Sequence, residues 1–165
     1  MPDFWFDTDS FVTPSRGPYR FKTVPKFWEF LEQKANEHII ASPEFVLEQE
    51  LTSSKPEHAD DLEKWAKKQQ GTLFISPNEA VQNAYSLVAE SVRTDPRYAS
   101  QHVTKFLDGA DSWVIAYAKA LGGRIVTFEK SESRSSKPKI PDVAGKFGIK
   151  CINLWDVLTE LKASF

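Results

Sequence analysis

The chain has 165 residues, of which 41% are hydrophobic and 13% aromatic, enough for one folded domain with a substantial core. No apolar run approaches the ~20 residues needed to cross a bilayer, and the opening MPDFWFDTDS lacks the pattern of a secretory signal, so we expect a cytoplasmic protein. A single cysteine, Cys151, and three scattered histidines exclude a disulfide framework and a metal site built from cysteines or paired histidines.

The charge is nearly balanced but unevenly spread. The formal net charge is -2, with 9 basic and 13 acidic side chains in residues 1–70 against 12 and 10 in residues 71–165. This balance is not that of a typical nucleic-acid-binding domain, which is usually basic. The basic excess is concentrated between Lys130 and Lys150. Such a run is most often a solvated loop, and it gains a functional meaning only beside an acidic site that attracts a polyanion.

Apolar runs and turn signals alternate along the chain. The elements they predict are, in chain order, a strand at 3–7, a helix at 23–37, a strand at 38–42, helices at 43–51 and 56–70, a strand at 72–75, helices at 77–93 and 108–121, strands at 124–128 and 149–152, and a helix from Asn153. Thr23, Ser42 and Ser76 are the predicted caps, because Ser42 and Ser76 each precede a proline and Thr23 has Pro25 near the first turn of its helix. Gly71 and Gly122 mark helix ends.

Alternation of strands with helices, without a tight hairpin signal, predicts parallel strands. We therefore expect residues 1–165 to form a single α/β domain, a three-layer α/β/α sandwich with a central, mainly parallel sheet. Ligands of such folds bind at the carboxyl ends of the strands. The residues that follow the strands at 3–7 and 124–128 are accordingly the first candidates for a site.

Two acids stand at these strand ends. Asp7 closes the first strand and Glu129 follows the strand at 124–128. Because the strands are expected to be parallel, both carboxylates should project from the same edge of the sheet.

Three further acids are placed by helical periodicity. Asp111 lies in line with the apolar face of the predicted helix at 108–121, and Asp108, one turn earlier, lies about 60° from it. Both can point from the start of that helix toward the strand ends. Glu50 falls on the apolar face of the predicted helix at 43–51, so it is also expected to point inward.

Each acid alone has an ordinary structural explanation as a turn, cap or loop residue, and taken singly that explanation is favoured. As a set, carboxylates from separate segments would raise one another's pKa by roughly 1–3 units per close pair unless a cation neutralised them. Oxygen ligands without His or Cys suit Mg²⁺ or Mn²⁺, which bind phosphate oxygens. The set therefore indicates a phosphoryl-transfer site.

Four motifs resemble those of the PIN-domain nucleases in order and spacing. They are Asp-Thr-Asp-Ser at 7–10, Leu-Glu-Gln-Glu-Leu at 47–51, Asp-Gly-Ala-Asp-Ser-Trp-Val-Ile-Ala at 108–116 and Val-Thr-Phe-Glu at 126–129. The stretches at 139–143 and 147–151 are similar to a PIN-like branch grouped with VapC-type toxins. The likeness covers nearly the whole chain.

The resemblance implies a ribonuclease with carboxylate-bound Mg²⁺ or Mn²⁺. The residues that match the four catalytic acids of the family are, in order, Asp7, Glu50, Asp111 and Glu129. The implied metal ligands are Asp7, Asp111 and Glu129, with Asp9 and Asp108 as auxiliaries. Many PIN domains carry Asp where this chain has Glu129, which leaves the metal geometry and number open.

The resemblance also implies partners. A toxin of this kind has an RNA substrate and a cognate antitoxin that buries the acidic edge with an Arg or Lys, and it is expected to form a homodimer. Adjacency to Glu129 adds a hypothesis from the sequence itself, in which basic side chains track the phosphates of RNA. These residues are Lys130, Arg134, Lys137 and Lys139.

Two alternatives stay open. Phe-Trp-Phe-Asp-Thr-Asp-Ser at 4–10 also resembles the opening motif of haloacid-dehalogenase-type phosphatases, in which Asp7 would be a nucleophile and Asp9 an acid/base. The second alternative is a catalytically silent PIN-like module that binds RNA or protein.

Overall fold

The central sheet is five-stranded and parallel throughout. The computed structural model describes residues 2–165. Its strands, which lie in the order β3-β2-β1-β4-β5, are β1 (Phe4–Phe6), β2 (Ile40–Pro43), β3 (Phe74–Ile75), β4 (Arg124–Val126) and β5 (Cys151–Ile152). Every neighbouring pair is parallel. The predicted α/β class and the five predicted strand positions are confirmed.

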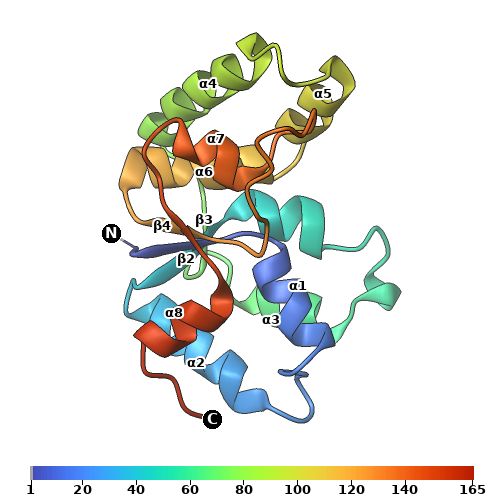
Figure 1. Ribbon diagram of the computed structural model, residues 1–165. Helices are drawn as coiled ribbons and strands as arrows, with labels where there is room; N and C mark the ends of the chain where they lie inside the picture. The colour runs from blue at the N-terminus through green and yellow to red at the C-terminus, as the bar shows by residue number, and fades with distance from the viewer. Residues whose placement is uncertain (1) are drawn as a thin grey trace.

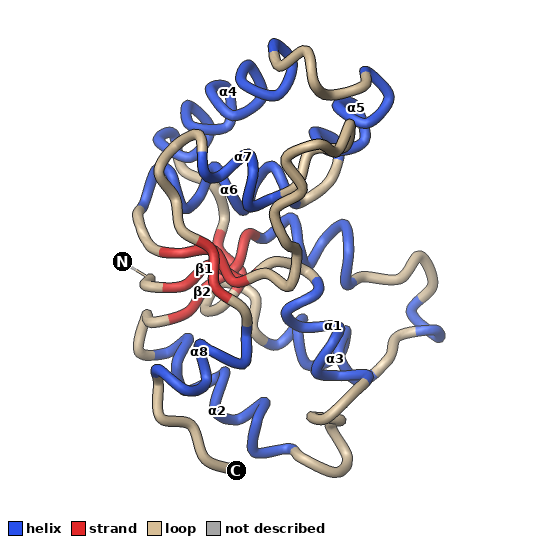
Figure 2. Tube along the Cα trace, viewed as in Figure 1, coloured by secondary structure: helices blue, strands red, loops and turns tan. Residues whose placement is uncertain are grey.

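Helices cover both faces of the sheet, so the fold is the predicted three-layer α/β/α sandwich (Figures 1 and 2). One layer holds α4 (Glu79–Thr94), α5 (Ser100–Asp108), α6 (Asp111–Leu121) and α7 (Ile140–Gly145). The other holds α1 (Asp9–Arg16), α2 (Pro25–Asn36), α3 (Asp61–Lys68) and α8 (Leu154–Glu160). A π-helix at Val46–Leu51 and a 3-10 helix at Pro56–His58 lie between β2 and α3. Within residues 2–165, the helices are too short or too polar for a membrane crossing.

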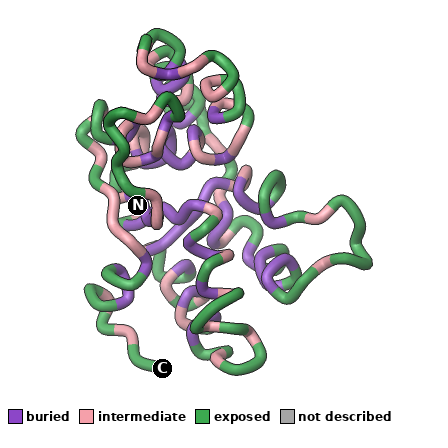
Figure 3. The backbone as a smooth tube through the Cα atoms, turned by 45° about the vertical axis from the view of Figure 1, so that its right-hand side comes forward, coloured by how far each residue is buried: buried purple, intermediate pink, exposed green. Residues whose placement is uncertain are grey.

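The core is continuous on both sides of β1, whose three residues are all buried (Figure 3). On one side the Trp5 ring packs on Tyr117 of α6, with ring centroids 5.2 Å apart. On the other side the Phe6 ring packs on Phe11 of α1 at the same separation. A strand that is covered on both faces has no polar side to display, which explains why its sequence is uninterruptedly aromatic.

Ser42 belongs to β2 and does not cap a helix, so that prediction is wrong. Its hydroxyl donates to the carbonyl of Phe6 at 2.8 Å, and its backbone N–H donates to the carbonyl of Leu73 at 2.8 Å. Both bonds cross to neighbouring strand segments, and they keep a buried serine fully hydrogen-bonded. The chain turns helical only after Pro43 and winds the segment 46–51 as a π-helix.

Two other predicted caps are also wrong. α2 follows Val24, which makes no side-chain cap, so Thr23 does not have the predicted role. α4 is capped by Asn78 rather than Ser76, because the Asn78 side chain accepts from the backbone N–H of Val81 at 2.9 Å. In both cases a residue nearer the first turn takes the capping position.

Helices α1, α5 and α7 lie in segments for which no helix is predicted. α5 takes up Asp108, which is therefore the last residue of one helix rather than the first of the next. Gly109, with extended backbone angles of φ -94° and ψ 179°, separates α5 from α6, which begins at Asp111. The two acids thus stand on different helices, contrary to the prediction.

Candidate functional site

The strand order reverses between β1 and β4, which are neighbours in the sheet although they are not consecutive along the chain. In open parallel sheets this switch point is where ligands bind, outside the carboxyl ends of the strands. Asp7 follows β1 and Thr127 follows β4. The backbone N–H of Asp7 donates to the carbonyl of Val126 at 3.1 Å, which holds the two strand ends together.

Asp7 is almost completely buried at this switch point, with 3% of its surface exposed. Its Oδ1 accepts hydrogen bonds from the backbone N–H of Ser10 at 3.0 Å and from the Ser10 hydroxyl at 2.7 Å. Burial raises the pKa of Asp7 to about 6, although hydrogen bonds from Thr127 and Ser10 oppose the shift. Asp7 therefore links β1 to the first turn of α1. Burial makes the ionised form of its carboxyl group unfavourable.

Asp111, the first residue of α6, has the most perturbed carboxyl of the site. Its pKa is raised to about 7, first by burial and then by the negative charges of Glu129, Asp7, Glu50 and Asp9, in that order. These acids come from four separate segments of the chain, Asp7 and Asp9 sharing one, and they lie close enough for their charges to act on Asp111. The charges of Asp7 and Glu129 therefore act on Asp111, and the joint role of the three acids at one ligand site stays a prediction.

Glu129 connects the site to α7. Its Oε2 accepts from the backbone N–H of Ile140, the first residue of α7, at 2.8 Å. Its own backbone N–H donates to the hydroxyl of Thr127 at 3.1 Å. Both contacts fix the position of Glu129 beside the end of β4.

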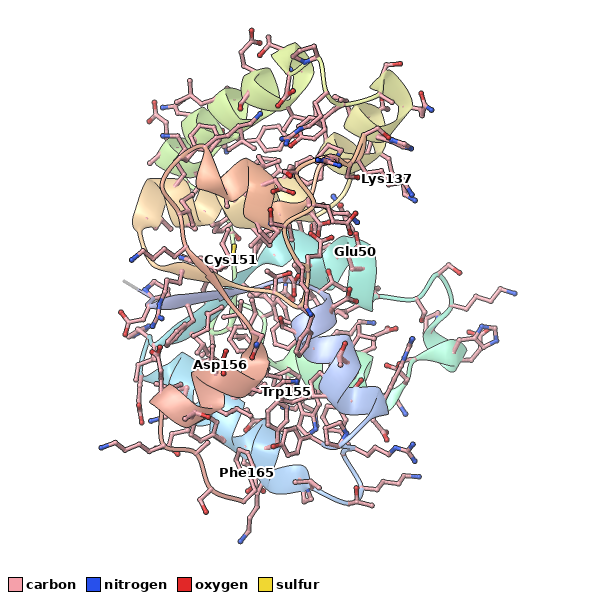
Figure 4. The ribbon with its side chains drawn as sticks, in the orientation of Figure 1. Glu50, Lys137, Cys151, Trp155, Asp156 and Phe165 are labelled. Atoms are coloured by element: carbon pink, nitrogen blue, oxygen red, sulfur yellow. The ribbon has the colours of Figure 1, made fainter. Side chains whose placement is uncertain are left out.

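Glu50 is exposed, so the prediction that it points inward is wrong. It lies near the end of the π-helix (Figure 4). Its Oε1 is 3.8 Å from the position that a Cβ on Gly109 would take, which places it against the turn between α5 and α6. A π-helical segment of this kind often marks a functional site.

The two auxiliary acids differ in position. Asp9 is exposed at the start of α1, and its charge acts on both Asp7 and Asp111. Asp108 is exposed at the end of α5 and lines a separate hollow with Arg93 and Tyr98. It is not among the largest contributions to the raised pKa of Asp111. Asp9 therefore belongs to the acidic site, whereas Asp108 lies apart from it.

The donor chemistry of the site fits a hard divalent cation, but the ligands are not assembled. Among residues 2–165, no three Asp, Glu, His or Cys side chains lie close enough to form a ready metal centre. The charged groups that raise the pKa of Asp111 are all carboxylates, which are ligands for Mg²⁺ or Mn²⁺. Like charges without a counterion separate, and a cation would remove the repulsion that raises the pKa of Asp111.

A cavity of about 320 Å³ opens beside the acids. Two of the predicted RNA-contact residues, Lys137 and Lys139, line it together with Glu50 and Asp111. Figure 4 shows Glu50 and Lys137 on the same side of the molecule, far from the C-terminal residue. The other two predicted RNA-contact residues, Lys130 and Arg134, are exposed on the same loop and do not line the cavity.

The part of the cavity lining that α5 supplies was not predicted from the sequence. It carries His102 and Lys105 of α5. The signal in the sequence was the spacing of Val103, Phe106 and Leu107, three apolar residues at helical intervals. A helix predicted from this spacing would have placed His102 and Lys105 just before the start of α6.

The chain is an α/β protein with acidic side chains near the switch point of a parallel sheet. The chain belongs to the family described as "Domain of unknown function (DUF4411)", which matches residues 4–165. No curated protein and no solved structure is significantly similar to it.

Proposed function

We propose that the protein is a cytoplasmic, metal-dependent ribonuclease of the PIN type. The observation that carries this proposal is the raised pKa of Asp111, about 7, caused by burial and by the charges of four other acids at the switch point. Such an arrangement costs folding free energy, and perturbed acids in a cleft are typical of functional sites. The resemblance of the motifs to PIN-domain nucleases supports the choice of reaction.

Asp7, Asp111 and Glu129 would hold Mg²⁺ or Mn²⁺, with Glu50 and Asp9 completing the negative environment. The ion, when bound, supplies an activated water and stabilises the leaving oxygen of a phosphodiester. The chain's own residues position that chemistry. Ser10 orients the Asp7 carboxylate, and the backbone N–H of Ile140 orients that of Glu129.

Asp111 would give up a proton when the cation arrives. Its pKa of about 7 means that the carboxyl is largely protonated in slightly acidic solution. A cation favours the ionised form, so binding and deprotonation are coupled. Metal binding should therefore strengthen steeply as the pH rises toward 7.

The likeness to VapC-type toxins extends the proposal to partners. An antitoxin would cover the acidic edge and present an Arg or Lys to the carboxylates, in the place of the cation's charge. By the same analogy, we propose that two copies of the protein form a homodimer.

An RNA-cleavage assay tests the proposal. Wild-type protein should cut single-stranded RNA in the presence of Mn²⁺ or Mg²⁺, and EDTA should abolish cutting. Asp111→Asn should lose orders of magnitude in rate while it stays folded, whereas the exposed-site control Asp61→Asn should be unaffected. Metal-independent activity, or a fully active Asp111→Asn, would contradict the proposal.

Phosphoenzyme trapping and an RNA-binding measurement beside the cleavage assay separate the alternatives. A phosphatase of the haloacid-dehalogenase type would form an acid-stable aspartyl-phosphate on Asp7, which a metal-dependent nuclease does not form. A silent binding module would bind RNA without cutting it under any of these conditions.

A further inference from the structure

We propose that the cavity beside Asp111 is a subsite for one nucleotide of single-stranded RNA, and that Lys105 on α5 is one of its phosphate contacts. This inference rests on the proposed function for the identity of the ligand. The subsite itself rests on the lining residues, the volume and the position of the cavity.

Three lysines from two segments line the cavity. Lys105 belongs to α5, and Lys137 and Lys139 belong to the segment between β4 and α7. Among residues 2–165, Lys105 and Lys137 make no ion pair, and the distance from the Lys139 ammonium to Glu132 is 3.9 Å, at the limit of an ion pair. Their positive charge is therefore available to an anionic ligand.

Part of the cavity lining is apolar. Phe106 and Ala110 are 8% and 1% exposed, and Pro138 is buried as well. His102 belongs to the same lining. Apolar residues beside cationic side chains suit a ligand with a flat base and a phosphate, because unpaired bases stack on apolar and aromatic surfaces.

The loop segment 133–139 is held in place by hydrogen bonds to α5 and to the residues that precede α5. The carbonyl of Ser136 accepts from the backbone N–H of Ala99 at 3.0 Å and lies 3.2 Å from Nδ1 of His102. The carbonyl of Ser133 accepts from the guanidinium of Arg97 at 2.9 Å. The cavity is thus built before a ligand arrives, which lowers the entropic cost of binding.

Size and position restrict the occupant. A volume of about 320 Å³ is at the small end of ligand sites, which run from roughly 300 to 1,000 Å³. A hollow of this size is too small for a base pair of a duplex, whereas an unpaired nucleotide can enter it. Because Asp111 and Glu50 line the same cavity, the nucleotide in it would lie next to the phosphodiester at the acidic site.

The test measures binding without cleavage. The affinity of a fluorescein-labelled eight-nucleotide single-stranded RNA is measured by anisotropy in EDTA, on the Asp7→Asn background, at several salt concentrations. Adding Lys105→Ala should weaken binding several-fold and lower the salt slope by about 0.7, the value for one phosphate contact on a single strand. Lys64→Ala, at an exposed lysine on α3 in the other helical layer, is the matched control and should change neither quantity.

The outcomes separate this inference from the proposed function. Unchanged affinity and salt slope in Lys105→Ala, or equal competition by a duplex of the same sequence, would overturn the subsite. If Lys105→Ala weakens binding but wild-type protein cuts no RNA with Mn²⁺, the subsite stands and the nuclease proposal fails. If wild-type protein cuts RNA and Lys105→Ala binds normally, the nuclease proposal stands and the subsite fails.

Discussion

The carboxylate of Glu129 accepts a hydrogen bond from the backbone N–H of Ile140 at 2.8 Å, and this bond joins the acidic site to the first turn of α7. The charge of the same carboxylate is the largest electrostatic contribution to the raised pKa of Asp111. Glu129 therefore has two roles that can be separated by mutation, as an oxygen acceptor for α7 and as a negative charge in the site.

The first prediction separates these roles. Glu129→Gln keeps an oxygen that can accept from Ile140 but removes the charge, so it should unfold near the wild-type midpoint and weaken Mn²⁺ binding. Glu129→Ala also removes the acceptor at a helix start, which should cost about 1 kcal/mol more. Urea denaturation in EDTA checks stability, with the exposed Glu90→Gln on α4 as the control. Equal destabilisation of the Gln and Ala variants would show that the hydrogen bond does not stabilise α7.

The second prediction concerns pH. The pKa of Asp7 is about 6 in the folded protein against 3.8 for an ordinary Asp, so the unfolded chain ionises first as the pH rises. The cost of burying the carboxylate is therefore absent below pH 3.8, grows between about pH 4 and 6, and is complete above that range. It amounts to at most about 3 kcal/mol for a shift from 3.8 to about 6.

Asp7→Asn should remove this cost without losing the acceptor oxygen for Ser10. In EDTA, its stability relative to wild type should rise from pH 4 to pH 7, and saturating Mn²⁺ should narrow the gap by stabilising wild type alone. Thermal melts at a series of pH values measure the stability difference between Asp7→Asn and wild type, with Asp61→Asn as the control. A stability difference that does not vary with pH would mean that Asp7 has an ordinary pKa.

The third prediction concerns Gly123, which precedes β4. Its φ is +97°, and a Cβ there would come within 2.8 Å of the Pro2 carbonyl and 3.0 Å of the Asp3 carbonyl. Gly123→Ala should therefore lower the free energy of unfolding by about 2 kcal/mol or more. The causes are backbone strain at a positive φ and a clash between the segments that lead into β4 and β1. Gly145→Ala is the matched control because a Cβ there meets no atom within 4 Å. Urea denaturation compares the two, and similar midpoints would contradict the prediction.

The strand positions could be predicted from the sequence because each strand is a short apolar run between turn signals. β1 is the clearest example, since burial on both faces leaves Phe4, Trp5 and Phe6 in succession. Helix starts were harder. Ser42 has the sequence pattern of a cap, but a buried tertiary hydrogen bond to Phe6 places it in β2. Local propensity cannot register a partner 36 residues away.

The acids were predictable to different degrees for the same reason. Asp7 and Glu129 follow strands directly, so the parallel topology places both at one edge. Glu50 was misplaced because the π-helix winds more slowly than an α-helix, so a wheel drawn at about 100° per residue gives the wrong direction. Asp108 was misplaced because the extended backbone at Gly109 interrupts what reads as one continuous helix.

The most direct test of the central claim is a calorimetric titration of Mn²⁺ into the metal-free protein at pH 6.5, in two buffers of different ionisation enthalpy. The account predicts binding accompanied by proton release, because the pKa of Asp111 is about 7, and it predicts that Asp111→Asn binds more weakly and releases fewer protons. Asp61→Asn should titrate like wild type. Absence of Mn²⁺ binding, or equal binding and proton release in wild type and Asp111→Asn, would contradict the claim that these carboxylates form a cation site.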